Sequence, residues 1–398
     1  MSKRVVGKVA CWGNSDFGRL GHGSSTGRSI PSILAALLHQ DFISVRCGGA
    51  HTAAVGIDGS VYSWGLNDAG QLGHYTHQET SMQEPQEVLL PEAATDIAVG
   101  HSHTLFLTDS SDVWAVGSNR HGQLGLGSRS GQEWLPRRVQ DLVGTKIVSI
   151  AAGAQHSLAV SAEGELFSWG SGLRGCLGHG SSLFRSNQNE IAPRLVKRLE
   201  GVKVQSAAGG LMNSGCVDAN GNVYLWGPHL RQPLTQAASE ALEPERMRGL
   251  QNVTQLALGG RHLVARTHGG RVATFGANDF GLLGLGSNEP PDPFQPSMIP
   301  DVRLEQVAAG WQHSAGVSSD GSLLTWGWGG SVGSESGLFP GHTSAGGQLG
   351  HDNDFDYWKP TPVLQLEISD SGSLPAGSGR FLQVSCGANH TAAIVDIT

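Results

Sequence analysis

Residues 47–65 read CGGAHTAAVGIDGSVYSWG, and most of this stretch recurs along the whole chain. It places two glycines and an alanine before His51, and it ends on the pair Trp64-Gly65. Between them, apolar residues alternate on both sides of Asp58-Gly59, a pair that favours a tight turn between two strands. The stretch therefore predicts two antiparallel strands joined by a hairpin.

The repeat is defined by an anchor residue that follows a Gly-x-x or similar triplet. Successive anchors are 49 to 57 residues apart, except for one last interval of 77. The seven anchors are His51, His103, His156, Asn213, His262, His313 and His390. A period near 50 residues is typical of propellers and solenoids.

A second motif lies between the anchors: an alternating strand that ends in an aromatic residue and glycine, as in Trp169-Gly170. In five units, Gly-x-Leu-Gly follows after four residues. Each unit predicts about four short strands, and no helical pattern of 10–15 residues alternates with them. Glycine fills 58 of 398 positions, which suits many tight turns. We predict an all-β, seven-bladed β-propeller with four-stranded blades that covers residues 1–398.

The two ends of the chain each hold part of a unit. The first Trp-Gly pair has no anchor before it, and the last anchor has no Trp-Gly pair after it. We expect residues 5–12 to pair with residues 381–397, so that one blade is shared by both termini. Such a blade closes the ring and leaves no free sheet edges between its halves.

These motifs resemble those of the regulator of chromosome condensation family over essentially the whole chain. The resemblance implies a seven-bladed propeller whose termini share a blade. Family members include an exchange factor for a small GTPase, a plant ultraviolet-B photoreceptor, organellar proteins and many interaction domains.

The repeated histidines could suggest a metal or a catalytic site. Each falls on a separate blade, and one position is Asn213, so we predict that each imidazole satisfies backbone groups at a strand turn. No nucleophile–base pair, phosphate loop or metal-ligand spacing stands out. We expect no enzyme activity, no catalytic residues, no cofactor and no metal.

Two specific family activities fit this sequence poorly. The photoreceptor absorbs light through tryptophans two residues before the anchors. Those positions here are Gly49, His101, Ala154, Leu211, Gly260, Trp311 and Ala388. The exchange factor needs an acidic residue just before one anchor. Those positions here are Ala50, Ser102, Gln155, Met212, Arg261, Gln312 and Asn389, and none is acidic.

Departures from the repeat point to candidate binding loops. Nineteen residues, 328–346, stand between Trp-Gly and Gly-x-Leu-Gly where five other units have four. This insertion contains Trp328, Phe339 and His342. We predict that it contributes to a partner-binding surface, and the alternative is a tolerated surface insertion. If the insertion does not bind, the alternative surface is the face bearing Arg261, Trp311 and Gln312.

Two further segments depart from the pattern. Residues 366–380 are rich in serine and glycine, and they predict a flexible linker. Residues 228–245 have lost the Gly-x-Leu-Gly motif, and they predict a helical or irregular excursion.

The net charge of −8 argues against direct DNA binding. The chain contains no run of 18 apolar residues, so we expect no membrane insertion, and no secretory signal is visible. The five scattered cysteines predict buried thiols in a reducing compartment. We expect a monomer inside the cell, in the nucleus or cytoplasm, or in mitochondria if a transit peptide has been removed.

We draw three functional hypotheses from this sequence. The first is a non-catalytic scaffold or adaptor that binds a protein or a ribonucleoprotein. The second is a guanine-nucleotide exchange factor for a small GTPase. The third is an organellar, mitochondrial member that acts in RNA processing, splicing or respiratory-complex biogenesis.

Overall fold

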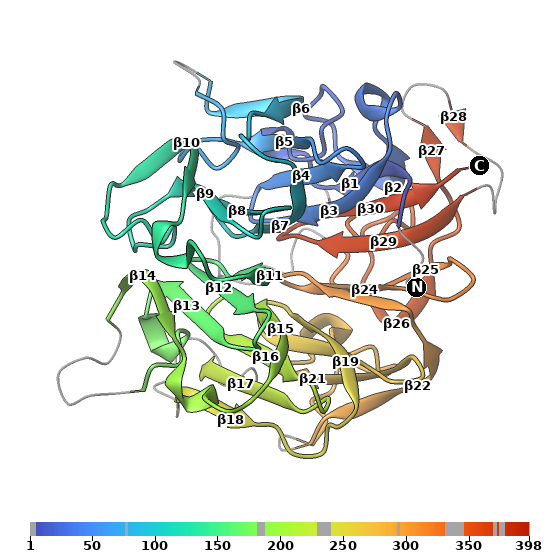
Figure 1. Cartoon of the computed structure of the whole chain (residues 1–398). Helices are drawn as coiled ribbons and strands as arrows, with labels where there is room; N and C mark the ends of the chain where they lie inside the picture. The colour runs from blue at the N-terminus through green and yellow to red at the C-terminus, as the bar shows by residue number, and fades with distance from the viewer. Residues whose placement is uncertain are drawn as a thin grey trace.

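The strands of the computed structural model form seven antiparallel sheets around a common axis (Figure 1). The structure describes residues 5–75, 79–180, 188–228, 240–292, 295–330, 346–368, 372–373 and 379–397. Each sheet is one blade, and the first strands of neighbouring blades contact one another around the axis. The predicted all-β, seven-bladed propeller is confirmed.

Six blades are continuous in sequence, and each runs from its innermost to its outermost strand. Blade 1 contains β3 (Phe42–Cys47), β4 (His51–Gly56), β5 (Val61–Leu66) and β6 (Ser81–Val88). Blade 2 contains β7 (Ala94–Val99), β8 (His103–Thr108), β9 (Val113–Ser118) and β10 (Gln132–Arg138). Blade 3 contains β11 (Ile147–Ala152), β12 (His156–Ser161), β13 (Leu166–Gly170) and β14 (Glu190–Leu195).

The next three blades continue the pattern. Blade 4 contains β15 (Val204–Gly209), β16 (Ser214–Asp218), β17 (Val223–Pro228) and β18 (Glu240–Arg246). Blade 5 contains β19 (Val253–Leu258), β20 (His262–Thr267), β21 (Arg271–Gly276) and β22 (Ser297–Arg303). Blade 6 contains β23 (Gln306–Ala309), β24 (His313–Val317), β25 (Leu323–Gly327) and β26 (Tyr357–Pro362).

Blade 7 joins the two ends of the chain. Its strands are β29 (Arg380–Cys386), β30 (His390–Asp396), β1 (Lys8–Gly13) and β2 (Arg28–Ile33). β1 pairs with β30 over six residues, from Lys8 opposite Val395 to Gly13 opposite His390. The expected closure by a shared blade is confirmed.

Two of the predicted irregular segments are more regular than expected. Within residues 366–380, the pairs Glu367–Ile368 (β27) and Gly372–Ser373 (β28) extend the sheet of blade 7 beyond β2. The prediction of an excursion over 228–245 was wrong at its end, because Glu240–Arg246 forms β18 and pairs with β17. Backbone pairing to an existing strand needs no repeat motif, so the motif loss was a poor guide here.

The hydrophobic core lies between the blades. Each apolar cluster among the described residues combines side chains from two neighbouring blades. The clusters therefore fill all seven interfaces between neighbouring blades, which we call joints. Trp64 and Trp169 are fully buried there. The indole N–H of Trp169 donates to the carbonyl of Gln123 in blade 2 at 2.9 Å. Trp12, Trp226 and Trp326 make the same kind of bond to the preceding blade, whereas the buried indole nitrogen of Trp64 has no hydrogen-bond partner among the described residues.

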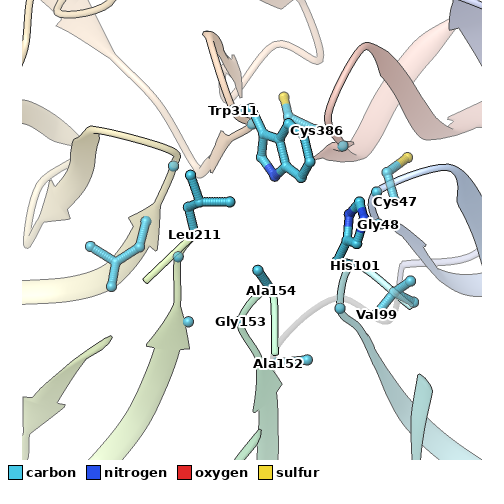
Figure 2. Close-up of a pocket in the computed structure, with 18 of the residues that line it drawn as sticks. Cys47, Gly48, Val99, His101, Ala152, Gly153, Ala154, Leu211, Trp311 and Cys386 are labelled. Atoms are coloured by element: carbon cyan, nitrogen blue, oxygen red, sulfur yellow. The ribbon is translucent and has the colours of Figure 1, made fainter. Parts of the chain in front are cut away.

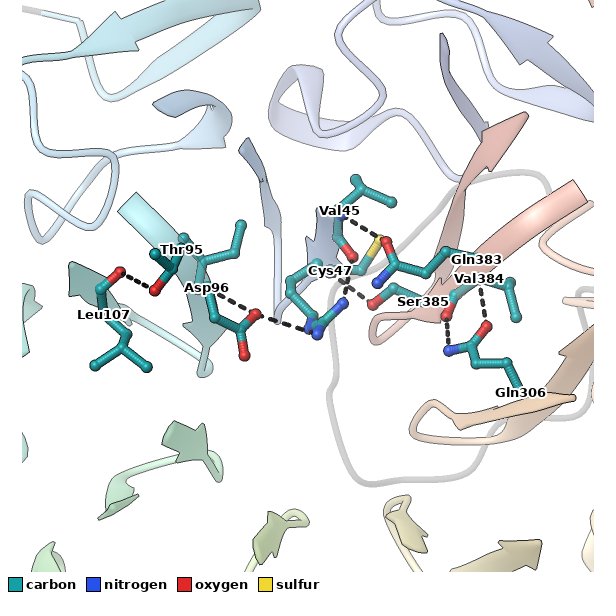
Figure 3. Close-up of polar contacts among 11 residues, drawn as sticks. Val45, Cys47, Thr95, Asp96, Leu107, Gln306, Gln383, Val384 and Ser385 are labelled. Atoms are coloured by element: carbon teal, nitrogen blue, oxygen red, sulfur yellow. Dashed lines mark hydrogen bonds and ion pairs between the residues drawn. The ribbon is translucent and has the colours of Figure 1, made fainter. Parts of the chain in front are cut away.

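Side chains of the innermost strands add polar links near the axis (Figure 3). Gln306 of blade 6 makes two hydrogen bonds to the backbone of Val384 in blade 7. Gln383 accepts from the N–H of Val45 in blade 1 at 2.8 Å. Arg46 then forms an ion pair with Asp96 of blade 2 at 3.3 Å. These links stiffen the side of the ring that contains the joints of blades 6, 7, 1 and 2.

Candidate functional site

The anchors and the first residues of the insertion, 328–330, lie at one end of the propeller. In six blades the residue after the Trp-Gly or equivalent pair donates its N–H to the carbonyl of the residue before the anchor. In blade 6 these residues are Trp328 and Gln312, with the two atoms 2.9 Å apart. The turn between the first two strands and the loop between the last two are therefore adjacent in each of these blades. We call this end of the molecule the anchor face.

The anchor histidines are buried, and each binds the neighbouring blade. The Nε2 atom of His51 lies 3.0 Å from the hydroxyl of Thr104, which follows the anchor of blade 2. The same bond recurs at distances of 2.8–3.0 Å. The other pairs are His103–Ser157, His156–Ser214, His262–Ser314, His313–Thr391 and His390–Thr52. The partners of the Nε2 atoms are thus side-chain hydroxyls of the next blade, and not the backbone groups at a strand turn that the sequence predicted.

The direction of this hydrogen bond follows from the hydroxyl. Thr104 has one hydroxyl hydrogen, and it donates that hydrogen to the carbonyl of Gln71 at 2.8 Å. The Nε2–H of His51 must therefore donate to the hydroxyl, which leaves Nδ1 unprotonated. Nδ1 of His51 is buried and has no hydrogen-bond partner among the described residues. A second proton on Nδ1 would have no acceptor there.

This geometry keeps the anchor imidazoles neutral. Burial lowers the pKa of His51, His103 and His313 to about 3. It lowers the pKa of His156 and His262 to about 4. Each of these imidazoles is thus neutral, buried and hydrogen-bonded to the next blade, which is the arrangement of a structural element.

The glycine three residues before each anchor makes room for the ring. A Cβ atom on Gly153 would lie 2.0 Å from Cε1 of His156. The backbone of Gly153 has no positive φ, so the requirement is for space and not for a left-handed conformation. This contact explains the Gly-x-x-His spacing.

The joint between blades 4 and 5 departs from this pattern. The anchor of blade 4 is Asn213, whose buried Oδ1 has no hydrogen-bond partner in the described part of the chain. The position that supplies the hydroxyl in the other blades is Leu263 in blade 5. Pro228, which follows Trp226-Gly227, has no N–H to donate to the carbonyl of Met212. Blade 4 therefore lacks both bonds that its anchor region would otherwise make.

A small cavity opens on the axis at the anchor face (Figure 2). Its volume is about 70 Å³, and its walls come from the turns that precede the anchors. The rings of His101 and Trp311 stack with centroids 5.4 Å apart, although they belong to blades 2 and 6. Leu211 of blade 4 points into the same space (Figure 2). The positions two residues before the anchors thus converge on the axis.

The four predicted binding residues that the structure describes fall on the anchor face, over blades 5 and 6. Arg261 forms an ion pair with Asp279 at 2.8 Å. The ring of Trp328 lies 6.2 Å from that of Phe280, centroid to centroid. The carbonyl of Gln312 accepts from the N–H of Trp328, and Trp311 is on the axis as described above. Phe339 and His342 lie outside the described residues.

Three aromatic residues of this region were missed by the sequence analysis. Phe280 is half-buried beside Trp328, whereas Phe355 and Trp358 are 68% and 44% exposed. Phe355 and Trp358 belong to the run HDNDFDYW at 351–358, which returns the chain from the insertion to β26. Its dense aromatic and acidic composition was the available indication in the sequence.

The family can now be assigned from this geometry and one comparison. The family model of the RCC1-like domain matches residues 8–393. The chain belongs to this family. The match covers all seven blades, which agrees with the resemblance to the regulator of chromosome condensation family.

Known relatives of this RCC1-like propeller have different roles. This chain is 34% identical to the ultraviolet-B receptor UVR8 of Arabidopsis thaliana over 331 residues, which are 82% of this chain and 74% of the receptor. It is 31% identical to a secretion-regulating guanine nucleotide exchange factor of Bos taurus over 421 residues, which are 97% of this chain and 82% of that protein. The crystal structure of Prp20p from Saccharomyces cerevisiae superimposes with a TM-score of 0.83 at 21% identity, covering all of this chain and 93% of that one. The last likeness shows the fold alone.

In the described part of the RCC1-like propeller, no three His, Cys, Asp or Glu side chains converge to hold a metal. The five cysteines are buried free thiols, and burial raises the pKa of Cys47 and Cys176 to about 12. No helix in the described segments has the length and apolar character to cross a membrane. The features that remain accessible are the aromatic and charged side chains of the anchor face.

Proposed function

We propose that this RCC1-like propeller is a non-catalytic scaffold that binds a protein partner with its anchor face over blades 5 and 6. The observation that carries the proposal is the group of aromatic side chains Phe280, Trp328, Phe355 and Trp358. Exposed aromatic side chains are enriched among the residues that dominate binding at protein interfaces. Rigid propellers commonly bind through the loops that they hold in place.

The insertion at 328–346 begins within this group. Trp328 is its first residue, and its backbone is fixed by the bond to Gln312. We infer that the insertion adds partner contacts to the aromatic group, with Phe339 and His342 as predicted contact residues. Arg261, Trp311 and Gln312 border the same area and belong to the proposed surface.

A pull-down of the tagged full chain with mass spectrometry tests this proposal. Trp328→Ala, and replacement of 328–346 by the four residues of 66–69, are expected to lose specific partners while the melting temperature changes little. Tyr75→Ala is the matched control, because Tyr75 is a 59% exposed aromatic residue in the same kind of loop on blade 1. Unchanged partner recovery by both variants would show that the insertion is not part of the binding surface.

Similarity to the secretion-regulating exchange factor supports a second candidate, nucleotide exchange on a small GTPase. The absence of an acidic residue before any anchor weighs against it. Release of fluorescent GDP from a panel of purified small GTPases distinguishes the two functions. Recovery of mitochondrial RNA-processing proteins, together with mitochondrial location of the tagged chain, would instead support the organellar hypothesis.

A further inference from the structure

We propose that the anchor face over blades 5 and 6 binds an arginine-bearing segment of a partner protein. The contacts come from the rings of Phe355 and Trp358 and from the carboxylates of Asp354 and Asp356. This inference rests on the proposed scaffold function and specifies the chemistry of the partner.

The loop that presents Phe355 is held in one conformation by its own hydrogen bonds. Asn353 donates its amide hydrogens to the carbonyl of His351 at 2.9 Å and to the hydroxyl of Tyr357 at 3.1 Å. Its amide oxygen accepts from the N–H of Phe355 at 3.0 Å. The rings of His351 and Tyr357 are in contact, with centroids 4.2 Å apart. A loop ordered in this way loses little conformational entropy when a partner binds.

Phe355 and Trp358 lie next to elements of both blades. A Cβ atom on Gly329 would lie 2.0 Å from the backbone carbonyl oxygen of Phe355, so the backbone at Phe355 adjoins the first residues of the insertion. A Cβ atom on Gly281 would lie 2.6 Å from Cδ1 of Trp358, so the ring of Trp358 packs against the loop of blade 5. Phe280 of the same loop lies 6.2 Å from Trp328, ring centroid to ring centroid.

The charge of this surface favours a cationic partner. Asp354 and Asp356 form no ion pair with any described residue, whereas Asp279 is already paired with Arg261. Burial, and then the neighbouring charge of Asp354, raise the pKa of Asp356. Residues 331–345 contain Glu335 and His342 but no lysine or arginine, so that segment supplies no permanent cation. The two carboxylates therefore lack a cationic partner in this part of the chain.

Arginine matches this combination better than lysine does. A guanidinium group is flat, so its face stacks on an aromatic ring while its edge donates two hydrogen bonds to a carboxylate. Charge-assisted pairs of this kind are stronger than neutral hydrogen bonds. The occupant we infer is a segment of a partner protein that presents arginine side chains to these rings and carboxylates.

Fluorescence anisotropy with defined peptides tests the inference on the full chain. The probe is a fluorescein-labelled peptide, GSGLRLRLGSGS, compared with copies in which both arginines are lysine or the uncharged isostere citrulline. We expect the arginine peptide to bind about ten-fold more tightly than the citrulline peptide, with the lysine peptide in between. The double variant Asp354→Asn/Asp356→Asn is expected to weaken binding of the arginine peptide about ten-fold. Asn at 356 keeps an acceptor for the N–H of Gly329, which Asp356 accepts at 2.9 Å, so folding is preserved.

A second variant and a matched control complete the design. Phe355→Ala removes a mostly exposed ring and is also expected to weaken binding about ten-fold. Glu163→Gln/Glu200→Gln makes the same charge change at two exposed positions elsewhere and is expected to leave affinity unchanged. Equal binding of arginine and citrulline peptides, no binding of either, or no effect of the aspartate variant would overturn the inference. The pull-down tests the scaffold function separately. That function stands if recovery of protein partners depends on Trp328, and it fails if recovery does not.

Discussion

His390 donates its Nε2 hydrogen to the hydroxyl of Thr52 across 2.9 Å, which links blade 7 to blade 1. The same hydroxyl donates to the carbonyl of Arg19 at 2.8 Å. Three segments far apart in sequence therefore meet at one buried oxygen atom. The same arrangement recurs at five other joints. We call this pair of hydrogen bonds, from imidazole to hydroxyl and from hydroxyl to carbonyl, the latch between two blades.

Thr52→Val is expected to destabilise the protein by about 1–3 kcal/mol. Valine has the shape of threonine, so the change removes the hydroxyl without opening a cavity. It leaves the Nε2–H of His390 without an acceptor in a fully buried site. Urea denaturation measures the loss, and Thr254→Val at an exposed position is the control. Equal midpoints for the two variants would show that the latch contributes little.

Restoring the missing latch between blades 4 and 5 is expected to show coupling between two substitutions. Asn213→His alone buries an N–H opposite Leu263, and Leu263→Ser alone removes a fully buried apolar side chain. Both single variants are expected to be less stable than the natural chain. The double variant is expected to recover about 1 kcal/mol or more relative to the sum of the single effects. A double-mutant cycle by urea denaturation measures this coupling, and additive effects would contradict it.

Acid is expected to unfold the propeller cooperatively between about pH 6 and pH 4. Burial lowers the pKa of six anchor histidines in the folded state, so the unfolded chain binds more protons below its ordinary histidine pKa of 6.5. The stability that depends on neutral anchor histidines is fully present above pH 6.5. It is lost as the pH falls towards the pKa values of these histidines in the folded state. In that window each histidine lowers the free energy of unfolding by about 1.4 kcal/mol per pH unit. Six such histidines therefore remove more than the typical stability of a domain within about two pH units.

The number of protons taken up on unfolding checks this explanation. It follows from the slope of unfolding free energy against pH, which urea titrations at several pH values provide. His262→Asn is expected to reduce the uptake near pH 5 by about one proton. His39→Asn changes an exposed histidine and serves as the control. An equal slope for His262→Asn and the natural chain would exclude this anchor as a source of acid sensitivity.

Arg19→Gln is expected to leave stability unchanged or to raise it by about 1 kcal/mol. Arg19 is fully buried, its Nη2 has no hydrogen-bond partner among the described residues, and Asp16 is 3.9 Å away. Burial lowers its pKa to about 10, so the site carries a charge at neutral pH. The equivalent Gln71 accepts from the N–H of Ala69 at 2.9 Å, and glutamine at position 19 can make the same bond. Differential scanning fluorimetry measures the change, and a lower melting temperature would mean that Arg19 is needed.

The fold was predictable because each blade repeats the same short motifs. The closure of the ring also followed from the sequence, because each end of the chain holds half of a unit. The role of the histidines did not follow, since their partners belong to the next blade. A threonine or serine follows every anchor except His262, where Leu263 stands, and that regularity was the sign of the missing partner.

The candidate site was predictable only in part. Trp328 stood out because the insertion breaks a spacing that five other units keep. Phe280 and Trp358 break no such spacing, and Trp358 comes close to Gly281 only because the loop of blade 5 lies against the outer strand of blade 6. Contacts of this kind depend on the spatial order of the blades, and a repeat motif carries no information on which loops touch.

The unlatched joint between blades 4 and 5 has a consequence for the evolutionary history of the chain. Asn213 and Leu263 belong to different blades, and each has departed from the pattern that the other would need. If the two positions began as histidine and a hydroxyl, loss of the hydroxyl first would leave a buried imidazole without its acceptor, whereas loss of the histidine first would leave the hydroxyl its bond to a carbonyl. Orthologues with histidine at position 213 are expected to carry serine or threonine at position 263, so that the two positions are inherited together.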